Sequence, residues 1–247
     1  MLDTLRNFQF DLANQSTTQP ALLPFPKDRT YIDSPVDERL RRLIARLQQD
    51  FTAHKGPPEY LLATDEAHYR QILFKIGLDA TNLDAAALYV YGPHILVLGP
   101  NVVALLDDHD ARARLAGLRI VTHEWFHAMR ASPNRVFGLE EGGAELFADR
   151  TTRTLTGIGG ELRRIQKYTN LVSGVEALGE AARGHGNAYH WMMPSRTEKD
   201  IAGWCRREFL ALGLEEQDTE SLVEYDERSS GSWGSLVQEA LRRRRKS

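Results

Sequence analysis

Residues 121–128, with the sequence VTHEWFHA, decide how the rest of the chain can be arranged. They contain His123, Glu124 and His127 in the pattern H-E-x-x-H. On an α-helix, residues four apart lie on one face, roughly 6 Å apart along the axis, so both imidazoles can reach one metal ion. The carboxylate of Glu124 can then lie beside that ion and accept a proton from a water molecule bound to it. The pattern therefore predicts a metal site on a helix.

The residues around this pattern are uncharged: Val121, Thr122, Trp125, Phe126, Ala128 and Met129. A helix that holds two metal ligands still must run through the core, and uncharged neighbours allow that burial. The alternative is a helix that carries two histidines on a solvated or packed face, without a metal.

A second stretch, residues 138–148 with the sequence GLEEGGAELFA, follows after a short connection. A catalytic zinc site needs three protein ligands and one open position, and Glu141 can supply the third ligand. Glu145 lies one helical turn later, where it can accept the free N–H of a ligand imidazole. The alternative reading is a helix start, where carboxylates such as those of Glu140 and Glu141 are favoured. That reading does not explain two glycines inside a helix, where each costs about 1 kcal/mol relative to alanine.

H-E-x-x-H followed by E-G-x-A-E resembles the gluzincin group of zinc metallopeptidases. The resemblance implies that His123, His127 and Glu141 bind Zn²⁺, that Glu124 is the general base, and that Glu145 supports a ligand from outside the coordination shell. It covers roughly residues 85–150. The separation between the second histidine and the glutamate is shorter than in many members of the group, which leaves the subfamily open and keeps Glu140 as an alternative ligand.

The expected fold is a mainly helical α+β, zincin-like domain with a small antiparallel or mixed sheet beside the helix of residues 121–128. Three closely spaced prolines predict an irregular N-terminal arm over residues 1–34, and a disordered leader is the alternative. Residues 35–247 are expected to form a single metallopeptidase domain. Within it, residues 35–156 hold the sheet and the zinc-ligand helices, and residues 157–247 form a helical C-terminal lobe.

Residues 86–98 read as a β-hairpin, because two apolar runs flank Gly92 and Pro93. In zincin folds an edge strand lines the active-site cleft. The resemblance therefore implies that this hairpin binds an extended peptide by main-chain hydrogen bonds. A purely structural hairpin is the alternative, and His94 is interpreted as a surface histidine rather than a ligand.

Apolar residues at helical spacing, together with capping and stop residues, predict further helices. Thr64 is the expected cap of the second one, and Asp107, Asp108 and Asp110 are the candidates for capping the central helix. The expected helices cover residues 35–53, 65–76, 111–129, 141–154, 162–175, 201–212 and 236–241.

Composition excludes several classes of function. The net charge of −3 indicates no nucleic-acid partner, and the basic run at residues 242–246 is interpreted as a solvated tail. The single cysteine, Cys205, rules out a disulfide framework within the chain and is interpreted as a packing residue. The absence of a secretory signal and of a long apolar run predicts a cytoplasmic protein without a membrane span, although export by a signal-free route stays open.

The leading functional prediction is a zinc-dependent metallopeptidase that acts on a protein or peptide. Its oxyanion needs a donor besides the metal. The candidates are Tyr189, His190 and His185, with Tyr168 behind them, and no spacing rule selects one. Two alternatives stay open: a regulatory or binding protein on a zincin scaffold, and a zinc amide hydrolase that acts on a non-peptide substrate.

Overall fold

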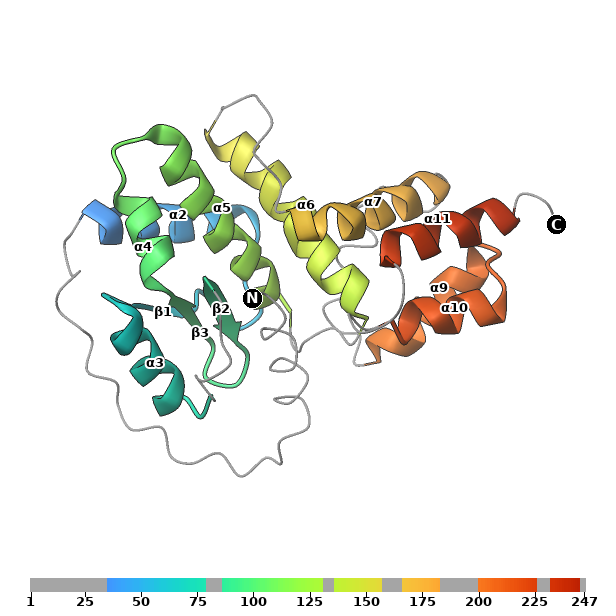
Figure 1. Ribbon diagram of the computed structural model, residues 1–247, viewed down its shortest axis with the longest axis horizontal. Coiled ribbons are helices and arrows are strands. Elements are labelled where there is room, and N and C mark those ends of the chain that lie inside the picture. Colours follow the sequence, from blue (N-terminus) through green and yellow to red (C-terminus); the bar gives the residue numbers. More distant parts are fainter. Residues whose placement is uncertain are drawn as a thin grey trace. The chain divides into compact units, whose positions relative to one another are not determined.

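The computed structural model describes residues 35–78, 86–130, 136–156, 166–182, 200–225 and 232–244 (Figure 1). These residues form nine helices and one three-stranded sheet, which confirms the predicted fold class, mainly helical with a small mixed sheet. The chain divides into two compact units, Met1–Ala131 and Ser132–Ser247. The predicted arm of residues 1–34 lies outside the described residues.

The sheet of the first unit has the order β1-β3-β2. Strand β3 (Ile95–Leu98) is central, and it pairs antiparallel with β2 (Ala87–Val90), which confirms the predicted hairpin. Strand β1 (Glu59–Leu62) pairs parallel with the other side of β3 and was not predicted. All residues of β2 and β3 are buried, so they are apolar throughout instead of alternating with polar ones.

Helix α3 (Glu66–Lys75) covers one face of this sheet. Its buried residues Tyr69 and Leu73 belong to the same core cluster as Leu88 and Val97. The cap of α3 is Asp65, whose side chain accepts the backbone N–H of His68 at 2.8 Å. The prediction of Thr64 as the cap is wrong by one residue, because Asp65 has the extended backbone that a capping carboxylate needs.

Three more helices complete the described part of the first unit. Helix α2 (Pro35–Asp50) confirms the prediction for that region, whereas α4 (Pro100–Asp107) was not predicted. Helix α5 (Ala111–Ala128) begins at Asp110, whose side chain accepts the N–H of Arg112 at 3.0 Å. Residues 121–128 are all buried, so the predicted passage of this helix through the core is confirmed.

The described part of the second unit consists of helices only. They are α6 (Phe137–Thr156), α7 (Gln166–Ala181), α9 (Ile201–Ala211), α10 (Glu216–Val223) and α11 (Trp233–Arg244). Helix α10 was not predicted, and α11 is longer than expected because its first turn is buried around Trp233. Cys205 is fully buried on α9, in agreement with its interpretation as a packing residue.

Trp233 organises the packing of α6, α7 and α11. A Cβ atom on Gly138 of α6 would lie 2.1 Å from the indole ring, and one on Gly174 of α7 would lie 2.5 Å from it. The indole N–H donates to the carbonyl oxygen of Leu222 on α10 at 3.1 Å. The fully buried Trp233 side chain therefore lies against α6 and α7 and is hydrogen-bonded to α10. Glycine is required at positions 138 and 174 because the indole ring lies against the backbone there.

Gly142, one of the three glycines of α6, also has a packing reason. A Cβ atom at this position would lie 2.8 Å from the carbonyl oxygen of Leu171 on α7. The small residue therefore allows the backbone of α7 to lie directly against α6, within the second unit. No helix in the described part of the chain is both long enough and apolar enough to cross a membrane.

Candidate metal centre

The C-terminal half of α5 is held firmly by hydrogen bonds within the first unit. The indole N–H of Trp125 donates to the carbonyl oxygen of Phe51 at 2.9 Å. The backbone N–H of His54 donates to the carbonyl oxygen of Ala128 at 2.9 Å, directly after the H-E-x-x-H pattern. Both bonds come from residues 51–54, so the loop that follows α2 fixes the last turn of α5.

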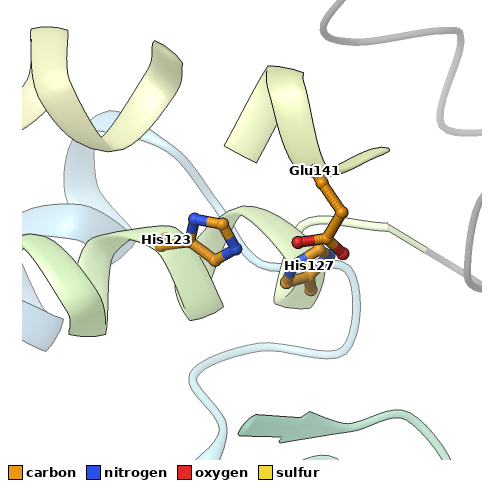
Figure 2. A group of neighbouring side chains, drawn as sticks. All are labelled: His123, His127 and Glu141. Atoms are coloured by element: carbon orange, nitrogen blue, oxygen red, sulfur yellow. The ribbon is translucent and has the colours of Figure 1, made fainter. Parts of the chain in front are cut away.

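His123 and His127 lie one turn apart on this helix, as their spacing predicts. Their ring centroids are 5.2 Å apart, and His127 is 1% exposed. The structure also brings Glu141 of α6 to them, as Figure 2 shows. One potential ligand atom from each of the three side chains lies within 4.8 Å of the other two. Among the described residues, no other group of three His, Cys, Asp or Glu side chains has potential ligand atoms this close together. All three residues of the group are buried.

This group fits a divalent metal ion. Two atoms that each lie about 2.1 Å from one ion are at most about 4.2 Å apart, so separations of up to 4.8 Å need only small side-chain rotations to close a coordination shell. Two imidazoles and one carboxylate are a donor set that zinc uses in catalytic sites. A buried carboxylate also costs free energy unless positive charge compensates it, and a cation at this point would supply that charge.

Glu124 is buried and points to the sheet. Its Oε2 accepts the backbone N–H of Tyr89 on β2 at 2.8 Å. Because Tyr89 N–H is bonded to Glu124, it does not take part in the ladder with β3. The predicted base is therefore attached to the edge strand of the sheet, and this attachment fixes the direction of its carboxylate.

The hydroxyl of Tyr69 lies near the same carboxylate. It is buried and has no hydrogen-bond partner within the described part of the chain. Burial raises the pKa of Tyr69 well above its usual value, and the negative charge of Glu124 raises it further. Tyr69 therefore stays protonated at neutral pH, within electrostatic reach of Glu124.

Of the two adjacent glutamates on α6, Glu141 belongs to the candidate metal group. Glu140 is buried as well. Glu145 lies one turn beyond Glu141 and is 2% exposed. Its predicted hydrogen bond to a ligand histidine stays a prediction.

The oxyanion candidates Tyr189, His190 and His185 lie outside the described residues. Tyr168 is on α7 and is half-buried. His94, interpreted as a surface histidine, is instead half-buried and bonds through both ring nitrogens, to Tyr89 and to Gly56. Sequence reasoning missed the roles of Tyr69, Tyr89 and His94 because no short motif links them to Glu124.

Comparisons of this chain with family models, with curated proteins and with solved structures found no match. The buried triad on two helices is consistent with a zincin motif.

Proposed function

We propose that this protein is a zinc-dependent metallopeptidase. The observation that carries the proposal is the buried group of His123, His127 and Glu141, with potential ligand atoms within 4.8 Å of one another. A zinc ion held there would polarise a scissile carbonyl group and lower the pKa of a water molecule toward neutrality.

Glu124 is the proposed general base. It follows the first ligand histidine directly, and its carboxylate is already oriented by the N–H of Tyr89. It would take a proton from the attacking water and later return it to the leaving amine. Binding zinc does not need Glu124, since three other ligands are at hand, so its position is best explained by proton transfer.

A peptide is the proposed substrate because of the position of β2. This strand lies at the edge of the sheet within the described residues, and Glu124 is bonded to its backbone. An extended peptide that pairs with main-chain groups of β2 other than the Tyr89 N–H, which Glu124 already accepts, would place its main chain beside the proposed base. The same edge gives no comparable reason to expect a small non-peptide amide.

The test compares the wild type with Glu124→Gln on a library of denatured-proteome peptides, with cleavage sites read by mass spectrometry. Zinc content is measured on both proteins. We expect equal zinc and cleavage by the wild type alone. Equal biological activity of both proteins without cleavage would point to the binding-protein alternative. A wild type that cleaves no peptide but hydrolyses small non-peptide amides would point to the amide-hydrolase alternative.

A further inference from the structure

His94 has an unusual backbone conformation for its position. Its φ is 58°, and among the described residues it is the one non-glycine residue with positive φ. This conformation costs roughly 1–2 kcal/mol for a residue with a Cβ atom. Gly92 lies two residues earlier in the same turn, and a glycine could adopt a positive φ without this cost. Gly92 is nevertheless not among the described residues with positive φ. The strain at His94 therefore calls for a compensating role of its side chain.

The imidazole of His94 is bonded on both sides. Its Nε2 lies 2.8 Å from the carbonyl oxygen of Gly56, and its Nδ1 is hydrogen-bonded to the hydroxyl of Tyr89. A carbonyl oxygen can only accept, so Nε2 carries the proton. In the neutral ring Nδ1 then accepts, and the Tyr89 hydroxyl donates. Burial raises the pKa of Tyr89 to about 12, which keeps this hydroxyl protonated.

Tyr89 connects this histidine to the proposed base. Its side chain bonds to His94, while its backbone N–H donates to Glu124 at 2.8 Å. The other partner of His94, Gly56, follows closely after His54, which is bonded to the end of α5. The hydrogen bonds thus form a closed circuit that starts and ends on α5. The hairpin cannot shift along α5 without breaking at least one of them.

We propose that Tyr89 and His94 form a clamp that positions the carboxylate of Glu124. The catalytic consequence of the clamp rests on the proposed function, whereas the clamp itself does not. A backbone N–H can only donate, so the clamp keeps Oε2 as an acceptor, and a proton taken up by Glu124 goes to Oε1. Tyr89 and His94 are positioning residues in this account, because they act on the reaction through Glu124.

The first part of the test measures hydrogen exchange of the Tyr89 amide by NMR, in the full-length protein. Tyr89→Phe and His94→Asn are compared with the wild type, and asparagine tolerates positive φ at this position. Tyr60→Phe is the matched control, since the Tyr60 hydroxyl on β1 of the same sheet bonds to Asp37. We expect exchange about fivefold faster or more in the two clamp variants, and unchanged in the control. The amides of β3 serve as references for global stability.

The second part measures kinetics on a cleaved peptide. We expect kcat to fall about 10–100-fold in both clamp variants, with KM unchanged, because positioning of the base is lost and binding is not. His94→Gly relieves the backbone strain and removes the ring, so added imidazole should restore part of kcat.

Each outcome decides the proposal. Unchanged exchange of the Tyr89 amide in both variants overturns the clamp, and faster exchange with unchanged kcat overturns its positioning role. If the wild type cleaves no peptide, the proposed function fails, and the exchange data alone then decide the clamp. Faster exchange in the two variants would support it, and unchanged exchange would overturn it.

Discussion

The backbone N–H of Tyr89 donates to Oε2 of Glu124 at 2.8 Å, and this bond is buried. It joins the helix that carries both candidate ligand histidines to the edge strand of the sheet. A buried carboxylate that accepts a backbone N–H is held in one orientation. A general base needs such positioning as well as a suitable pKa, because it must lie within reach of the proton that it removes.

Replacement of Glu124 by glutamine separates catalysis from zinc binding. Glutamine keeps the size of the side chain and an oxygen that accepts the Tyr89 N–H, but it cannot take up a proton at neutral pH. We expect unchanged zinc content and Tm, and a rate of peptide hydrolysis about 10²–10⁴-fold lower. Zinc analysis, thermal melting and a cleavage assay on one preparation check this. A variant that hydrolyses peptides at the wild-type rate would show that Glu124 is not the base.

Glu145 is predicted to orient a ligand histidine, most directly His123. Glu145→Ala should weaken zinc affinity by roughly 10–100-fold, because the imidazole loses the acceptor that fixes its tautomer and direction. Competition with a fluorescent zinc chelator measures the affinity. The control is Glu216→Ala, at an exposed position in the first turn of α10. Equal affinities in the two variants would leave Glu145 as an ordinary helix carboxylate.

Removal of metal should lower the thermal stability. A ligand that binds only the folded chain stabilises it by about 2.7 kcal/mol at a free concentration one hundred times its Kd. We therefore expect a lower Tm after chelation and its recovery on addition of zinc, followed by differential scanning fluorimetry. His127→Ala should abolish the response to zinc. The same response in that variant would place the zinc elsewhere in the chain.

Gly138→Ala should destabilise the second unit. The added Cβ atom would lie 2.1 Å from the Trp233 indole, which is fully buried and cannot move aside. Overpacking of this kind costs typically about 1–3 kcal/mol. Gly117→Ala on α5 is the milder comparison, since its nearest neighbour is a leucine side chain at 3.0 Å. Urea denaturation of both variants measures the difference, and a Gly138→Ala protein as stable as the wild type would contradict this packing.

The sequence predicts those parts of the structure that depend on local spacing. His123 and His127 share a helix face whatever the rest of the chain does, and the hairpin of residues 86–98 needs only two apolar runs and a turn. The long-range pairings were missed. Strand β1 pairs with β3 across more than thirty residues of chain, and the bonds from Tyr89 to Glu124 and from His94 to Gly56 are equally non-local. No periodicity encodes such partners.

The glycines of α6 show a mixed result. The small residues Gly142, Gly143 and Ala144 predict that this helix lies close against the helix of residues 121–128, but at Gly142 the structure places the backbone of Leu171 of α7. The approach of α7 could not be predicted, because it depends on long-range packing such as the fit of Trp233 against Gly138 and Gly174. Side-chain volume at one position indicates a close contact, but the partner follows only from the folded arrangement.

The most direct test of the central claim is zinc titration of the metal-free protein by isothermal calorimetry, with Glu141→Gln and Glu140→Gln as a matched pair of neighbours. We predict that the wild type and Glu140→Gln bind about one zinc ion per chain, and that Glu141→Gln loses most of its affinity. Absence of zinc binding by the wild type would contradict the account. So would a result in which Glu140→Gln loses zinc and Glu141→Gln retains it.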